Sequence, residues 1–228
     1  MSAPGPTVAI MQPYFFPYAG YFRLFLAADL FVIYDCVQFP RRGRVHRSEV
    51  PGPGGTPEWL TLPLAHQPRD TPIRDLAFAE HAATMWPERL SRYPWWRDSS
   101  GNAATERLRA AIEDVTGPVA DYLIRALLAT ADLLGLPTPT IRSSSLDLDP
   151  DVHGQDRILA IASALGAGAY VNAPGGRLLY QAEDFARRGM TLRFLAPYDG
   201  PFMHLLPALF TAEASRIRAD IARTTTHA

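Results

Sequence analysis

The residues best suited to catalysis or ligand binding follow an apolar run, Leu30–Tyr34. Asp35 comes directly after this run, and an arginine-rich segment comes next, with Gln38, Arg41, Arg42, His46 and Arg47. An aspartate or a histidine can take a proton from a reacting group, and arginine binds phosphate or carboxylate through two parallel hydrogen bonds. We therefore predict Asp35 and His46 as catalytic residues and the other four as substrate-binding residues. A solvated basic loop is the alternative interpretation.

A loop rich in aromatic residues and proline precedes this segment. It lies between the apolar run Val8–Met11 and a short helical pattern at Phe22–Ala28. Ligands of open α/β sheets usually bind at loops that leave the carboxyl ends of strands, and tyrosine offers both an aromatic wall and a hydroxyl group. We predict a ligand pocket here, with Gln12, Tyr14, Tyr18 and Tyr21 as binding residues. The alternative is a structural loop whose rings cover the core.

Polar residues also follow strand-like segments in the second half of the chain. Three serines end the segment PTIRSSS, a helical pattern begins near Asp156, and Asn172 ends another apolar run. Serine hydroxyls and backbone N–H groups at a strand end can bind phosphate. We predict Ser144, Asp156, Arg157 and Asn172 as substrate-binding residues. Asp156 can equally be a simple charge at a helix N-terminus.

The composition excludes several classes of function. A net charge of −1 argues against a broad nucleic-acid-binding face, although an aminoacyl-tRNA donor stays open. All 22 basic residues are arginine, and a chain without lysine has no Schiff-base nucleophile and no lysine-containing phosphate loop. No metal-ligand spacing is present, so we expect no metal site, and the sequence leaves the cofactor unknown.

The single cysteine, Cys36, is expected to be a buried small residue and not a nucleophile. No apolar run is long enough for a membrane span, and the first residues do not resemble a signal peptide. We therefore expect the protein in the cytoplasm of a bacterium.

Apolar runs alternate with helical patterns along the 228 residues. This order favours an α/β fold with a mostly parallel sheet flanked by helices, which is Rossmann-like. We expect a single domain over residues 1–228, with a helical insert or lid at about 80–136. Within the insert we predict a broken helix at 85–98 and a helical stretch at 105–134 interrupted near Gly117. We also predict a strand at Trp59–Leu64, a helix at Asp156–Leu165 and one C-terminal helix at Leu205–Ala222.

Four blocks of the chain resemble the WbqC-like family. They are QPYFFPYAGYF, DLFVIYDCVQFPRRGRVHR, WLTLPLAHQPRDTPIRDLAF and QDRILAIASALGAGAYVNAPGGRLLY, in this order between about residues 8 and 198. The resemblance implies a bacterial enzyme of O-antigen or natural-product biosynthesis. It also implies transfer of an aminoacyl-type group, such as glycyl, to the amine of an amino sugar or a similar acceptor. Cys36 stands where the family often has an acidic residue, which argues against a paired-carboxylate mechanism.

A second, more distant resemblance concerns the segment Tyr18–Tyr21. Its position after the first strand is similar to that of the His-x-Gly-His signature of nucleotidyltransferases, and Arg142–Ser145 is loosely similar to their serine motif. Tyrosine replaces both histidines and carries no positive charge at neutral pH. The resemblance therefore implies a nucleotidyltransferase-like form of the α/β fold, with a retained nucleotide pocket and altered chemistry.

These observations favour a transferase that uses a small-molecule amine acceptor and an activated acyl donor. The substrate's own amine would be the nucleophile, since the chain offers no convincing one. Two alternatives stay open: a nucleotide-binding, ligase-like enzyme related to nucleotidyltransferases, and a non-catalytic ligand-binding subunit that delivers an intermediate to a partner enzyme.

Overall fold

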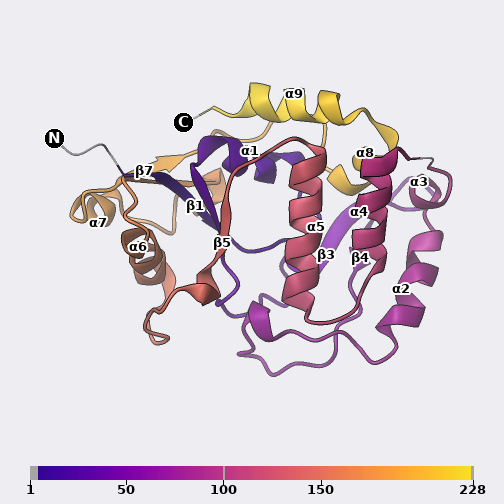
Figure 1. Ribbon diagram of the computed structural model, residues 1–228, viewed down its shortest axis with the longest axis horizontal. Coiled ribbons are helices and arrows are strands. Elements are labelled where there is room, and N and C mark those ends of the chain that lie inside the picture. The colour runs from indigo at the N-terminus through magenta and orange to yellow at the C-terminus, as the bar shows by residue number, and fades with distance from the viewer. Residues whose placement is uncertain (1–4, 100, 227–228) are drawn as a thin grey trace.

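The central feature of the fold is a parallel sheet. In the computed structural model, which describes residues 5–99 and 101–226, this sheet has five strands in the order β5-β2-β1-β6-β7 (Figure 1). The strands are β1 (Thr7–Met11), β2 (Leu30–Ile33), β5 (Thr140–Arg142), β6 (Ala169–Asn172) and β7 (Thr191–Phe194). The predicted α/β fold with a parallel sheet is therefore confirmed.

The strand order creates a switch point in the middle of the sheet. From β1 the chain moves outward through β2 to β5, and it then returns to the other side of β1 with β6 and β7. Val8 of β1 is in register with Leu30 on one side and with Tyr170 on the other. In open α/β sheets, ligands bind in the crevice beyond the strand ends at such a point.

Helices cover both faces of the sheet because the strands are apolar on both. Along β1, Val8 and Ile10 face α6 (Gly154–Ala164) and α7 (Ala182–Ala186), whereas Ala9 packs in the core on the opposite face with α1 (Ala19–Ala27). This alternation follows from the two-residue period of a strand. It also explains why β1 reads as a continuous apolar run, which is typical of parallel strands buried on both faces.

Four helices lie beside the sheet where the sequence predicts an insert. They are α2 (Ala82–Ser91), α3 (Pro94–Arg97), α4 (Ala103–Glu113) and α5 (Val119–Leu133). The broken helix predicted at 85–98 is confirmed, since α2 and α3 are separate helices, and so is the interruption predicted near Gly117. Phe15, from the loop after β1, packs against Trp86 of α2 and Tyr122 of α5, with ring centroids 5.8 and 6.3 Å away. The helices therefore share one core with the sheet, and a lid function for them stays a prediction.

The insert is preceded by an antiparallel hairpin of β3 (Arg47–Pro51) and β4 (Pro57–Thr61). The strand predicted at Trp59–Leu64 thus begins and ends a few residues earlier. Short 3₁₀ turns follow at η1 (Ile73–Asp75), η2 (Ser143–Ser145) and η3 (Pro174–Gly176).

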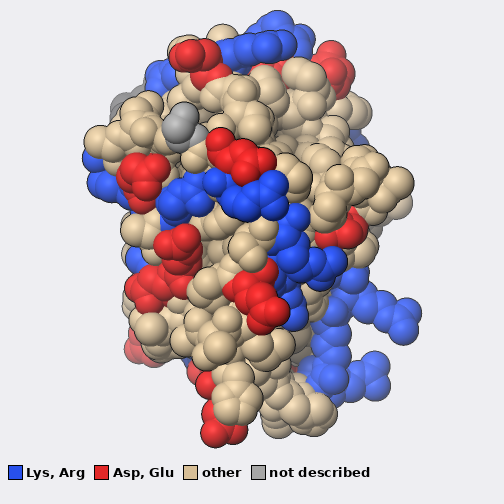
Figure 2. Space-filling view, turned by 90° about the vertical axis from the view of Figure 1, so that its right-hand side faces the viewer, with Lys and Arg blue, Asp and Glu red and all other residues tan. Residues whose placement is uncertain are grey.

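On the face around α2, α3 and α4, basic and acidic side chains are interspersed (Figure 2). One such pair is Arg97 with Asp98, at 2.8 Å.

The predicted single C-terminal helix is wrong. The segment forms two helices, α8 (Leu205–Thr211) and α9 (Ala214–Thr224), because the backbone is extended at Ala212 and Glu213. The break lets each helix bury its apolar residues against a different partner, α8 on β3 and α3, and α9 on α1.

A buried arginine fastens α1 to the last part of the chain. Arg23 is 1% exposed, and its guanidinium donates to the backbone carbonyls of Gly20, Ala196 and Thr224 at 3.2, 2.9 and 2.7 Å.

In the described part of the chain, no helix combines the length and apolar character that crossing a membrane requires.

Candidate functional site

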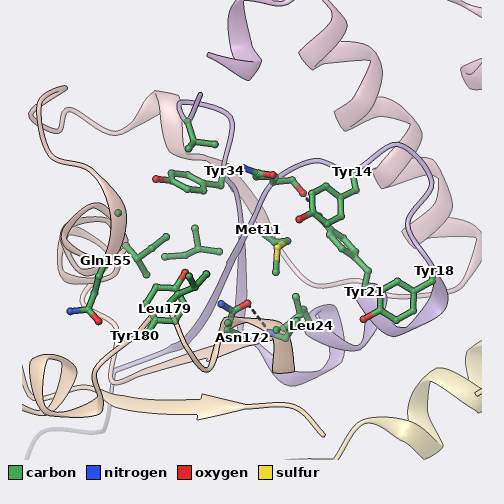
Figure 3. A pocket seen from close by; sticks show the side chains of 18 residues that line it. Met11, Tyr14, Tyr18, Tyr21, Leu24, Tyr34, Gln155, Asn172, Leu179 and Tyr180 are labelled. Atoms are coloured by element: carbon green, nitrogen blue, oxygen red, sulfur yellow. Dashed lines mark hydrogen bonds between the residues drawn. The ribbon is translucent and has the colours of Figure 1, made fainter. Parts of the chain in front are cut away.

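A cavity lies at the switch point, between the ends of β1 and β6 (Figure 3). Its volume is about 540 Å³, and its walls come from β1 and the loop after it, α1, the start of α6 and the loop after β6. We call it the switch-point pocket. Five residues predicted from the sequence line it: Gln12, Tyr14, Tyr18, Tyr21 and Asn172. The fold thus brings together side chains from two distant segments.

Tyrosines form one wall of the pocket. Tyr18 directly precedes α1, and Tyr21 lies in its first turn. The Tyr21 hydroxyl donates to the backbone carbonyl of Gln12 at 2.8 Å. Burial raises the pKa of Tyr21 well above its ordinary value, and burial also raises the pKa of Tyr14. Both phenols are therefore neutral at pH 7, so they can orient a ligand by hydrogen bonds but cannot take up its proton.

The loop that carries these tyrosines is strained. Phe16 has a φ of 42°, in the left-handed region that residues other than glycine rarely adopt. The Ser48 hydroxyl donates to the Phe16 carbonyl at 2.8 Å, and the Phe15 N–H donates to the Arg44 carbonyl at 2.9 Å. The arginine-rich segment and β3 therefore hold the loop in place. Strain that is held in this way is found preferentially at functional sites.

Three lining residues with polar side chains were not predicted as site residues: Tyr34, Gln155 and Tyr180. Gln155 is in the first turn of α6, and its side-chain oxygen accepts a hydrogen bond from the Gln181 N–H at 2.6 Å. Burial raises the pKa of Tyr34 to about 12. Position just after a strand is the signal that could have found Tyr34. Tyr180 follows an exposed pair of leucines, and no local pattern marks it.

Asp35 does not line the switch-point pocket. Its carboxylate is fully buried and accepts hydrogen bonds from Arg142 Nε at 2.7 Å, Ser143 Oγ at 3.0 Å, and both the N–H and Oγ of Ser144 at 2.9 and 2.8 Å. Arg142 also contacts Asp121 of α5 at 2.6 Å. These bonds join the end of β2 to the end of β5 and to the insert, and they use the acceptor positions of the carboxylate.

His46 and Arg47 also lie outside the switch-point pocket. The His46 ring packs edge-on against Phe39 at 5.0 Å, and its Nδ1 atom is buried with no hydrogen-bond partner among the described residues. Burial, and then the charge of Arg47, lower the pKa of His46. The Arg47 guanidinium lies 4.2 Å from the ring centroid of Trp59 and donates to Gly43 O at 3.2 Å.

The remaining predicted residues fall into three places. Arg41, Arg42 and Gln38 line a separate cavity beside Arg69, and Arg41 donates to the Gln67 carbonyl at 2.5 Å. Gln38, Ser144 and Arg157 line a further cavity of about 550 Å³, which shares Tyr34, Val37 and Gly154 with the switch-point pocket. We call this the second cavity. Asp156 is exposed in the first turn of α6.

The described residues contain no group of three or more His, Cys, Asp or Glu side chains that could hold a metal ion.

Comparison with known proteins identifies a family to which the chain is similar and a relative. The WbqC-like protein family matches residues 12–217. The uncharacterized protein Rv1507c of Mycobacterium tuberculosis is 26% identical over 204 residues, which is 85% of this chain and 83% of that protein. No solved structure matches the chain.

Proposed function

The chain belongs to the WbqC-like protein family, and from this premise we propose that it is a biosynthetic enzyme that forms an amide bond. In this proposal it moves an acyl or aminoacyl group to the amine of an amino sugar or a similar small acceptor. The acceptor occupies the switch-point pocket. The observation that carries the proposal is the composition of that pocket, which combines tyrosine rings with the side-chain amides of Gln12, Gln155 and Asn172.

Uncharged hydrogen-bonding groups suit a polyhydroxylated or amine-bearing ligand. Phenols and amides both donate and accept hydrogen bonds, and aromatic walls pack against the apolar faces of a small molecule. Among the described residues that line the pocket, none is Cys, Ser, His, Asp, Glu or Arg. Burial raises the pKa of Tyr14, Tyr21 and Tyr34, which makes these phenols poor nucleophiles, so a covalent acyl-enzyme at this pocket is not expected.

Direct transfer between two bound substrates follows from this composition. The acceptor nitrogen forms a bond to the acyl carbon, the bond from that carbon to the leaving group breaks, and the amine's proton departs with the leaving group. The protein contributes by holding the two substrates in reacting geometry, which can supply much of the rate enhancement. We propose Asp35 as a positioning residue, because its acceptor positions are filled. The catalytic role of His46 stays a prediction.

The experiment is a binding and product assay on the purified protein. Thermal shifts are measured with nucleotide-linked amino sugars, nucleotides, acyl-CoA species, amino acids and aminoacyl-tRNA, and mass spectrometry then looks for the amide. A ligand at 100 times its dissociation constant should add about 2.7 kcal/mol of stability. Tyr18→Phe removes only a hydroxyl from the pocket and should weaken acceptor binding. Tyr93→Phe removes a hydroxyl that bonds Glu58 outside the pocket, and it should not.

Equal loss of acceptor binding in both variants, or acceptor binding without amide formation under any donor, would refute the transferase proposal. The second outcome would favour the non-catalytic binding subunit. One observation favours a nucleotide-binding, ligase-like enzyme. Tyr18 and Tyr21, which stand where nucleotidyltransferases have the two histidines of their signature, lie at the start of α1 and line the switch-point pocket. That enzyme would consume ATP in step with product, whereas the transferase uses a donor that is already activated.

A further inference from the structure

The second cavity adjoins the switch-point pocket on the side of β2 and β5. It lies between the loops that leave these strands and the N-terminus of α6, and its volume is about 550 Å³. Tyr34, Val37 and Gly154 line both cavities, so an extended ligand could occupy the two together. Gly154 has a φ of 59°, a conformation that favours glycine, and it starts α6 at this shared boundary.

A buried positive charge sets the character of the second cavity. Arg157 lines it and is only 8% exposed. The guanidinium donates to the Asp149 carbonyl at 2.5 Å and to the Cys36 sulfur at 3.4 Å, and within the described residues it forms no ion pair with a carboxylate. Burying a charge without a counter-charge is costly. A guanidinium has five N–H donors, and these two contacts leave most of them for a ligand.

The other groups around the cavity also favour an anion. The N-terminus of α6 lines it, and no side chain caps this end of the helix. Uncapped N–H groups and the positive end of the helix dipole attract phosphate. Arg74 and His153 add further donors at the edge. The one acidic residue in the lining, Asp70, is exposed and therefore opposes this attraction only weakly.

We propose that the second cavity binds a phosphate group of a substrate, through Arg157 and the start of α6, while the rest of that substrate reaches toward the switch-point pocket. The inference rests on the proposed function for what the phosphate is attached to. Two sources share this chemistry: the diphosphate of a nucleotide-linked acceptor and the phosphate of a phosphopantetheine-type donor.

Cys36 provides a direct test. The prediction that Cys36 is buried is wrong, because the residue is partly exposed. It lines the second cavity beside Arg157, and it is the only cysteine of the chain. The rate of its alkylation by iodoacetamide is measured with and without uridine diphosphate, 4′-phosphopantetheine, inorganic phosphate and malonate. A ligand at ten times its dissociation constant should slow alkylation about elevenfold, because the free fraction falls as 1/(1 + [L]/Kd).

Arg157→Met should abolish the protection, and Arg157→Lys, which keeps the charge but loses the planar fork, should weaken it. Each variant is compared with its own rate in the absence of ligand, since the substitution also alters the surroundings of Cys36. Arg188→Met is the matched control, because Arg188 is exposed and lines none of the three cavities described above. It should keep the protection of the wild type.

Protection by one of the two esters that depends on Arg157 supports the inference and identifies the source. Protection that persists in Arg157→Met, or that only inorganic phosphate or malonate gives, overturns it. If Cys36 does not react, or if Arg157→Met does not fold, calorimetric titration of the same ligands into the wild type and Arg157→Lys decides. A protein that binds these esters but forms no amide would keep this inference and lose the transferase proposal.

Discussion

Replacing Asp35 separates a positioning role from a catalytic one. Asp35→Ala leaves Arg142 Nε and the donors of Ser143 and Ser144 without their buried acceptor. Breaking a buried ion pair by removing one partner typically costs about 3–5 kcal/mol. Asp35→Asn keeps the shape but loses the charge, and a hydrogen bond to a charged group is worth about 1.5–3 kcal/mol. Asp121→Asn removes the half-exposed partner of Arg142 and should cost about 0–1 kcal/mol.

Urea unfolding measures these differences. With a slope of about 2 kcal/mol per molar urea, which is typical of small proteins, Asp35→Ala should lower the midpoint by about 1.5–2.5 M. Asp35→Asn should lower it by about half as much, and Asp121→Asn should shift it very little. The slope itself should be unchanged in all three variants.

An Asp35→Ala protein with the midpoint of the wild type would refute the positioning role. If such a stable variant also lost amide formation, Asp35 would act on the substrate despite its filled acceptor positions, as the sequence alone suggests. A midpoint for Asp121→Asn as low as that for Asp35→Ala would show that the Arg142–Asp121 pair stabilises the fold as much as the Arg142–Asp35 pair, which contradicts the reasoning.

Three other substitutions test separate parts of the structure. The pKa of His46 is lowered from its ordinary value near 6.5, so its contribution to stability is present above about pH 6.5 and lost as the pH falls toward the folded pKa. His46→Gln should therefore reduce the loss of stability between about pH 6.5 and 5 in urea midpoints, whereas exposed His66→Gln should not. Tyr21→Phe removes the bond to the Gln12 carbonyl and should cost about 0.5–1.5 kcal/mol; an unchanged midpoint contradicts this. Arg23→Met leaves buried carbonyls without donors and should lower the free energy of unfolding by about 2–6 kcal/mol in the same measurement. A loss below about 1 kcal/mol would contradict the role of Arg23 in fastening α1 to the last part of the chain.

The first strands and the pocket loop were predictable because their signals are local. Val8–Met11 and Leu30–Tyr34 are apolar runs of strand length on either side of a short helical pattern, and this order alone indicates parallel pairing. The tyrosine loop follows the first run directly. Position after a strand was therefore sufficient to predict Gln12, Tyr14, Tyr18 and Tyr21 as residues that share one pocket.

The surroundings of Asp35 were not predictable in this way. The residues that fill its acceptor positions lie 107 to 109 positions later in the chain, and no local pattern pairs them with it. Its location after a strand predicts a site residue, whereas the register of β2 with β5 makes it a buried acceptor. The C-terminal helix fails for a related reason. Helical periodicity does not show that Leu205 and Ile217 pack against different partners.

The contacts of Arg23 also have a consequence for folding during translation. The carbonyl of Thr224 lies 201 residues after Arg23, and at about 5–20 residues per second a ribosome needs about 10–40 s to make that length of chain. Throughout that interval α1 lacks its anchor at Thr224, and for most of it α1 also lacks its anchor at Ala196. The tyrosines at the start of α1 are therefore translated well before α9, the helix that packs against α1.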